Sequence, residues 1–69
     1  MEVRAEMPGV INSILVSEGD KVHNGDEVIQ IELMKTMFSI MASGNGVVKD
    51  ILVKEGDLVA EGETLVVLD

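Results

Sequence analysis

The residue whose position most strongly indicates chemistry is Lys35, near the midpoint of the 69-residue chain. A lysine side chain ends in a primary amine that an enzyme can modify covalently, although most lysines in turns are only solvated charges. Lys35 lies at the joint between two similar halves of the sequence, so no residue of the second half corresponds to it. This position predicts that Lys35 is a presented side chain and a modification site.

Other chemistries have too few suitable residues in this chain. It contains no cysteine and a single histidine, which excludes disulfides, thiolate ligands, a cysteine nucleophile and a multi-histidine zinc site. When the two halves are aligned, His23 falls on Ala60, so we interpret His23 as a turn residue. Asp20 and Asp57 are equivalent, and we interpret them as parts of one repeated turn. We therefore predict no catalytic residue and no metal site.

Charge and composition limit the classes of partner. Thirteen acidic and five basic residues give a net charge of -8, which argues against nucleic acid and favours partners with basic docking faces. One phenylalanine, with no tyrosine or tryptophan, leaves little for base stacking. No apolar run reaches the roughly 18 residues of a spanning helix, and the acidic N-terminal residues do not resemble a signal peptide. We predict no membrane insertion by this domain and a cytoplasmic location.

The most informative feature of the whole sequence is an internal repeat. A shift of 37 aligns residues 9–32 with residues 46–69, and 10 of these 24 pairs are identical. Of the 14 remaining pairs, four exchange one apolar residue for another and two exchange one acid for another. Two copies are too few for a solenoid, so they predict one domain, residues 1–69, with an internal pseudo-twofold axis and a core shared between the copies.

Each copy has the pattern of short strands separated by turns. Residues 10–16 and 28–33 are rich in valine, isoleucine and leucine and predict strands. Residues 37–42 are mostly apolar and predict another strand, while residues 21–22 are long enough only for a bridge. Residues 23–26 and 43–46 contain glycine and asparagine and predict turns. No segment has helical periodicity of sufficient length. The predicted architecture is all-β, a small sandwich or flattened barrel of about eight strands in two sheets.

The apolar alternation also predicts which residues face the core. Its phase slips between Ile11 and Ile14 and again at the equivalent place in copy two, which indicates a bulge in each half. Ile40 and Ala42 are predicted to point inward and Met41 outward. The orientation of Phe38, Met34 and Met37 stays open between core packing and a soft contact patch near Lys35.

The repeat predicts where Lys35 lies. Glu32 aligns with Asp69, the last residue, so the segment that contains Lys35 begins where copy two stops. Equivalent points of the two copies lie at opposite ends of a pseudo-twofold structure. We therefore expect Lys35 on a tight turn at an exposed tip, far from both termini.

Residues 32–37, Glu-Leu-Met-Lys-Thr-Met, resemble the biotin attachment motif Glu-Ala-Met-Lys-Met of biotinyl domains, the family of the biotin carboxyl carrier proteins. The paired Glu-Gly-Asp turns at residues 18–20 and 55–57 match the same family, and the resemblance covers the whole chain. Leu33 replaces the usual alanine, and Thr36 stands where the second methionine is expected, with Met37 one place later. The resemblance implies a flattened β-barrel, a barrel-sandwich hybrid of two four-stranded sheets, with the lysine on a hairpin.

By this resemblance, biotin is attached covalently to Lys35 by a biotin protein ligase. Met34 and Thr36 flank the attachment site, and Glu32 and Met37 complete the motif. The resemblance further implies a swinging-arm carrier that moves carboxybiotin between a biotin carboxylase and a carboxyltransferase. Such a domain is a non-catalytic part or subunit of a biotin-dependent carboxylase or decarboxylase.

Two other functions remain open. A lipoyl carrier of an acyl-transfer complex would share the fold, although lipoyl domains typically have Asp-Lys-Ala at the modified lysine, and here Met34 precedes Lys35. An unmodified β-sandwich interaction module, with Lys35 inert, is the alternative outside the carrier class. The protruding thumb of some bacterial carrier proteins is not expected, because Val16 runs directly into the turn at residues 17–20.

Overall fold

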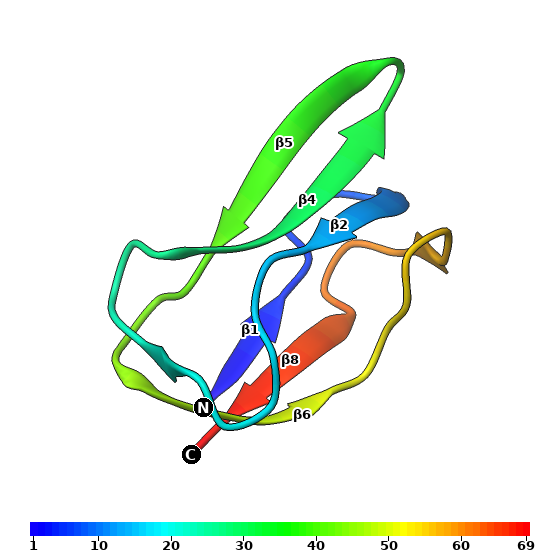
Figure 1. Cartoon of the computed structure of the whole chain (residues 1–69). Coiled ribbons are helices and arrows are strands. Elements are labelled where there is room, and N and C mark those ends of the chain that lie inside the picture. The colour runs from blue at the N-terminus through cyan, green and yellow to red at the C-terminus, as the bar shows by residue number, and fades with distance from the viewer.

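The chain folds into eight short strands without a helix (Figure 1). The computed structural model describes all residues, 1–69. The predicted all-β class is therefore confirmed. No helix is long and apolar enough to cross a membrane. The strands are β1 (Glu2–Arg4), β2 (Gly9–Ile14), β3 (Lys21–Val22), β4 (Glu27–Leu33), β5 (Thr36–Met41), β6 (Gly46–Ile51), β7 (Leu58–Val59) and β8 (Thr64–Leu68).

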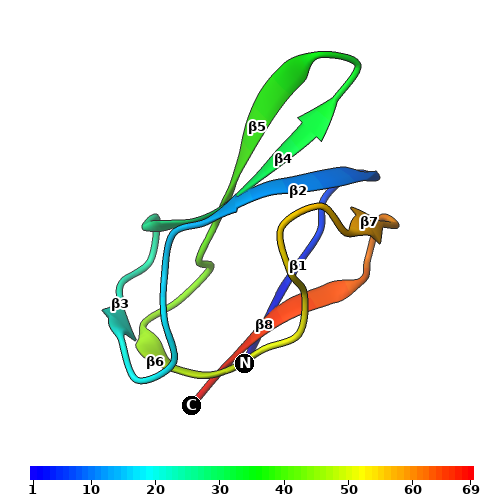
Figure 2. The same ribbon diagram turned by 45° about the vertical axis from the view of Figure 1, so that its right-hand side comes forward.

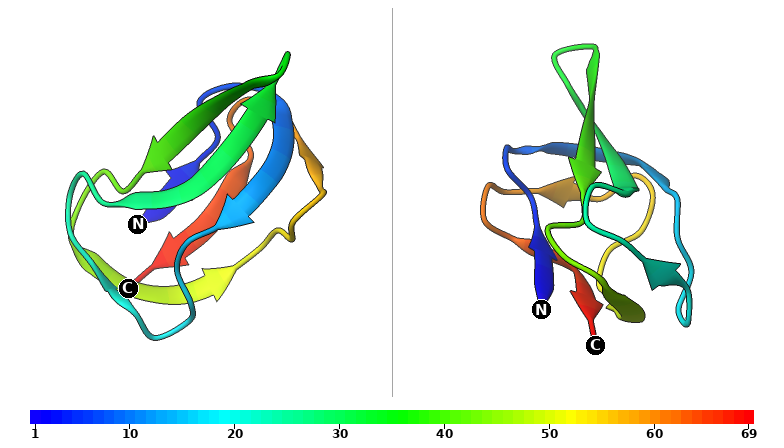
Figure 3. Two further views of the ribbon diagram at one scale, coloured as in Figure 1. Left: turned by 45° about the horizontal axis from the view of Figure 1, so that its top comes forward. Right: turned by 90° about the vertical axis from the view of Figure 1, so that its left-hand side faces the viewer.

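The strands form two four-stranded antiparallel sheets, ordered β1-β8-β6-β3 and β5-β4-β2-β7 (Figure 2). The shift of 37 residues converts β2 into β6, β3 into β7 and β4 into β8, so it converts one strand order into the other. Each sheet therefore contains strands of both copies. The predicted flattened barrel of two sheets related by a pseudo-twofold axis is confirmed (Figure 3).

The core lies between the sheets and consists of aliphatic side chains from both copies. Ile40 and Ala42 are buried, as predicted, and Met41 is exposed, also as predicted. Every buried residue is apolar, which avoids the cost of burying unpaired polar groups. Gly9 is buried as well, and the core side chains are those of Val3, Ala5, Ile11, Val22, Val28, Ile29, Ile31, Ile40, Ala42, Val48, Val53, Val59, Leu65, Val66 and Leu68.

Bulges interrupt β2 and β6 where the alternation slips. The register of β2 against β4 shifts between Ile11 and Ser13, and that of β6 against β8 shifts between Val48 and Asp50. The two shifts are 37 residues apart, so the prediction of an equivalent bulge in each half is confirmed. A bulge bends its strand and takes a backbone group out of the ladder.

The four turns on either side of the short strands β3 and β7 have the same structure, at residues 17–20, 23–26, 54–57 and 60–63. In each, the third residue is a glycine with φ between 85° and 92°, a conformation that costs other residues free energy. At the fourth position a carboxylate accepts the backbone N–H of the first residue, as in Asp20 with Ser17 at 2.8 Å and Asp57 with Lys54 at 2.9 Å. The repeated acids therefore cap turns. His23 lies in such a turn and donates its N–H to Asp26.

The turns of each copy bind the bulged strand of the other copy. Gly19 N donates to Val48 O, and Gly56 N donates to Ile11 O, both at 2.8 Å. Val48 N in turn donates to Asp20 O, and Ile11 N to Asp57 O, also at 2.8 Å. Because these bonds cross between the copies, neither copy satisfies its own backbone alone.

The end of β2 differs from the prediction. A strand was predicted over residues 10–16, whereas β2 ends at Ile14. Leu15 N still donates to Val28 O, but the next residues enter the turn that starts at Ser17. Val16 is apolar although it lies outside a strand, because its half-buried side chain packs against the core.

Gly9 should tolerate no larger side chain. A Cβ atom at this position would meet the side chain of Ile31 and lie 2.7 Å from the carbonyl oxygen of Glu32. We expect Gly9→Ala to lower the free energy of unfolding by about 1–3 kcal/mol, because overpacking displaces β4. Chemical denaturation measures this change. Lys49→Ala, at an exposed strand position, is the control and should change the free energy by less than about 0.5 kcal/mol; equal effects of the two substitutions would contradict the packing.

Candidate functional site

Lys35 lies at the end of a hairpin formed by β4 and β5, which extends beyond the other strands of the molecule (Figures 1 and 3). The strands pair from Glu27 opposite Met41 as far as Leu33 opposite Thr36. Only Met34 and Lys35 remain unpaired between them. The loop is therefore as short as an antiparallel hairpin normally permits.

The backbone of this loop is left-handed at both residues. Met34 has φ 53° and Lys35 has φ 63°, and they are the two non-glycine residues of the chain with positive φ. Two consecutive positive φ angles are typical of a type I′ turn, which matches the twist of the strands but favours Asn-Gly. For residues with a Cβ this conformation costs on the order of 1–2 kcal/mol each. Such a conformation persists only where the surrounding structure holds it, and here the paired strands β4 and β5 do so.

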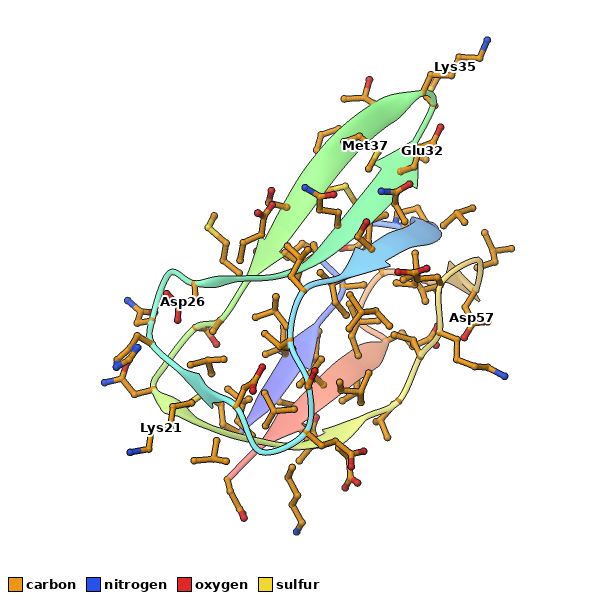
Figure 4. The ribbon with its side chains drawn as sticks, viewed as in Figure 1. Lys21, Asp26, Glu32, Lys35, Met37 and Asp57 are labelled. Atoms are coloured by element: carbon orange, nitrogen blue, oxygen red, sulfur yellow. The ribbon has the colours of Figure 1, made fainter.

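The Lys35 side chain projects from the tip into solvent (Figure 4). The two ion pairs of the chain join Arg4 to Glu2 and His23 to Asp26, and no side-chain hydrogen bond involves Lys35. Both termini lie at the opposite end of the molecule (Figure 1), where the Met1 amino group donates to Leu68 O at 3.0 Å. The predicted placement of the lysine turn far from the termini is therefore confirmed.

The residues of the predicted motif gather around this tip. Met34 is 89% exposed and Met37 is 45% exposed, so neither belongs to the core. Thr36 and Glu32 are also exposed, and Glu32 is paired with Met37 across the hairpin (Figure 4). Of the two orientations that the sequence left open for Met34 and Met37, the structure has the exposed one.

Phe38 occupies an intermediate position. It is paired with the buried Ile31 on the inner face of the hairpin, but the hairpin extends past the opposite sheet and leaves Phe38 only half-buried. It is less exposed than Met34 and Met37, but it does not belong to the core, whose partly buried neighbours are Met7, Ile14, Val16 and Ile51.

The carboxyl group with a shifted pKa is that of Glu2, at the end of the molecule opposite Lys35. A hydrogen bond from Arg4, together with one from Thr64, lowers the pKa of Glu2 below its ordinary value. These residues connect β1 to β8 near the termini. The charged groups near the tip are the amine of Lys35 and the carboxylate of Glu32, which lies on β4 of the same hairpin.

A covalently attached group fits this tip. The structure has no pocket and no cluster of three or more metal-ligating side chains. A covalent attachment needs an unhindered primary amine held at a defined place, which is what the geometry at Lys35 provides. The other lysines are Lys21 on β3, Lys49 on β6 and Lys54 in a turn, and none lies in a strained two-residue loop.

The strand register adds two neighbours that sequence analysis did not single out. Val10 on β2 is paired with Glu32, and Leu58 on β7 is paired with Val10. Both are exposed, so the outer face of the sheet continues from the motif as an apolar surface. The signal that could have identified Leu58 is its alignment with Lys21, an exchange of an apolar for a charged residue within the repeat.

Known structures share this arrangement. The urea carboxylase of Kluyveromyces lactis matches all of this chain with a TM-score of 0.93 and 36% identity. A single-chain, multi-domain long-chain acyl-CoA carboxylase matches 96% with a TM-score of 0.88 and 24% identity, which shows the fold. The matches cover 6% and 7% of those two chains, so this chain is similar to one small part of each.

A lipoyl domain has the same fold. The lipoyl domain of the 2-oxoglutarate dehydrogenase complex of Azotobacter vinelandii matches 90% of this chain and 78% of its own, with a TM-score of 0.74 and 29% identity. Comparison with curated protein sequences gives no match. A model of the family described as "Biotin-requiring enzyme" matches residues 1–68. The chain therefore belongs to the biotin/lipoyl attachment family, whose members carry a covalently attached cofactor.

Proposed function

We propose that this domain carries biotin on Lys35 and moves the attached group between the active sites of a biotin-dependent carboxylase. The observation that carries the proposal is the strained turn at Met34 and Lys35, which fixes a free amine at the tip farthest from the termini. The domain itself supplies no catalytic group. Its contribution is position, since the chemistry of a carrier belongs to its cofactor and to the sites that it visits.

Attachment would convert the Lys35 amine into an amide. The neutral Nζ would attack the carbonyl carbon of a biotin carboxyl group that a biotin protein ligase has activated with ATP as a mixed anhydride with AMP. The new C–N bond would form as the C–O bond to the phosphate of AMP breaks, AMP would leave with that electron pair, and the nitrogen would release one proton. Biotin bound in this way supplies a ring that can hold a carboxyl group. Lys35 loses its positive charge in the process.

The hairpin has the rigidity that a carrier requires. β4 is hydrogen-bonded to β2 on one side and β5 on the other, and its Ile29 and Ile31 are fully buried. These contacts hold the loop in its costly conformation. Because the termini leave from the opposite end, a linker to further domains would not obstruct the tip. A biotin carboxylase and a carboxyltransferase are the partners that we propose for it.

Lipoate is the second candidate cofactor, because a lipoyl domain shares the fold. Two observations favour biotin. Met34 precedes Lys35 as methionine does in the biotin attachment motif, and the match to urea carboxylase has the higher identity, 36% against 29%. Neither observation concerns the cofactor directly, so mass measurement must separate the two.

Lys35→Arg tests the attachment site. Incubation with biotin protein ligase, biotin and ATP should add one biotin to the wild-type protein and none to Lys35→Arg, because a guanidinium does not form the amide. Intact mass spectrometry measures the increment. Incubation with a lipoyl ligase is the parallel experiment, and a lipoyl increment alone would select the second candidate. Modification of Lys35→Arg, or of neither protein by either ligase, would contradict the attachment.

Met34→Asn tests the strain in the turn. Asparagine tolerates positive φ better than methionine does, so the substitution should raise the free energy of unfolding by about 1 kcal/mol. Chemical denaturation measures the change. Met34→Ala is the matched control, because alanine keeps a Cβ and the cost of the left-handed backbone; it should leave the stability nearly unchanged. A stability of Met34→Asn at or below that of Met34→Ala would show that the turn is not strained.

The same position tests the motif. Met34→Ala should lower the initial rate of biotinylation, because the exposed methionine side chain beside the amine is lost. Thr36→Met restores the residue of the family motif and should not lower the rate. Rates are measured with the same ligase at one concentration of each protein. The reverse order of the two effects would refute our interpretation of the motif.

A further inference from the structure

A row of three apolar side chains and one carboxylate crosses the outer face of one sheet next to the Lys35 turn. Leu58 on β7, Val10 on β2, Glu32 on β4 and Met37 on β5 are paired in succession across the four strands. Leu58 is 79% exposed, and Val10 and Met37 are exposed as well. We refer to these four residues as the hairpin row. It ends on the strand pair that bears the strained loop.

The second sheet provides an internal reference for the hairpin row. There, Lys21 on β3 is paired with Val47 on β6, just as Leu58 is paired with Val10. The repeat thus matches valine with valine, but it matches Leu58 with an exposed lysine.

This difference shows that the fold accepts a charged side chain at the position of Leu58. Folding therefore does not explain why a leucine is left almost completely in water. Soluble proteins carry single exposed apolar residues without consequence, but an apolar row beside a functional group marks an interaction surface. Met37 lies on β5 of the hairpin that ends at Lys35, so the row belongs to the sheet that carries Lys35.

We propose that the hairpin row is the docking surface for the enzyme that acylates Lys35. This inference rests on the proposed function, because it presupposes that Lys35 is the attachment site. The reacting atom in acylation is Nζ of Lys35, and its reach is that of the lysine side chain alone. The acylating enzyme must therefore bring its surface against the turn and the strands next to it. Enzymes that act after attachment reach the cofactor through a longer arm.

The composition of the row specifies the complementary surface. Apolar side chains at both ends, Leu58 and Met37, require an apolar partner surface, and the carboxylate of Glu32 between them requires a lysine or arginine. The net charge of -8 would steer such a basic surface toward the domain. Leu58 is the most exposed apolar side chain of the row, which makes it the residue to test.

Leu58→Lys gives the second copy the residue that the first copy already has at this position. We expect it to raise KM for the domain in biotinylation and to lower kcat/KM by about tenfold, with kcat nearly unchanged. Steady-state kinetics with purified biotin protein ligase measure both constants, and thermal unfolding checks that the fold is kept.

The matched control is Leu15→Lys. Leu15 is an exposed leucine of copy one that directly follows β2, and its N–H donates to the carbonyl oxygen of Val28 near the start of β4. Leu15→Lys therefore adds the same charge away from the Lys35 turn. It should change kcat/KM by less than about twofold. Leu58→Ala removes the side chain without adding charge and should also raise KM.

Each alternative outcome can be distinguished. Equal kcat/KM values for Leu58→Lys and Leu15→Lys, with a biotinylated wild type, would overturn the docking surface and leave the proposed function intact. A defect in carboxylation of the biotinylated domain, without a defect in ligation, would assign the row to the carboxylase and overturn the inference. Absence of biotin from the wild-type protein would remove both proposals together.

Discussion

The reciprocal hydrogen bonds between the two copies are the constraint on which the rest of the structure depends. The turn at Gly19 bonds to the bulged strand at Val48, and the turn at Gly56 bonds to the bulged strand at Ile11. The N–H of each of these strand residues is also donated back to the facing turn, so both backbone groups of Ile11 and of Val48 are paired between the copies. The two halves are therefore locked together as one unit. A chain of 69 residues without disulfides needs such locking, because its core is small.

This framework is what permits a strained loop at the tip. β4 lies inside its sheet and buries Ile29 and Ile31 completely, so the hairpin that it forms with β5 is anchored over most of its length. Pairing as far as Leu33 and Thr36 leaves two residues to reverse the chain. Met34 and Lys35 must then adopt positive φ, although neither residue favours it. The free amine of Lys35 is presented at a fixed point because the surrounding structure leaves its backbone little choice.

The internal repeat separates structural from functional residues. Features present in both copies, such as the turn-capping acids, the turn glycines and the bulges, have a structural explanation in each half. Features present in one copy need another explanation. Lys35 and the methionines beside it have no counterpart, and Leu58 is replaced by Lys21. The proposed attachment of the cofactor accounts for the lysine, and the proposed docking surface accounts for the exposed leucine.

The sequence by itself determined the all-β class, the two-copy organisation, the bulges and the place of the lysine turn. These properties follow from local composition and periodicity, which are visible along the chain. Only the tertiary structure decided that β2 stops at Ile14, that Leu33 pairs with Thr36 and that Leu58 lies in line with Glu32. The physical reason is that strand register is set by hydrogen bonds between distant segments. The left-handed conformation of Met34 and Lys35 is likewise imposed by the pairing of the strands around them and not by their own preferences.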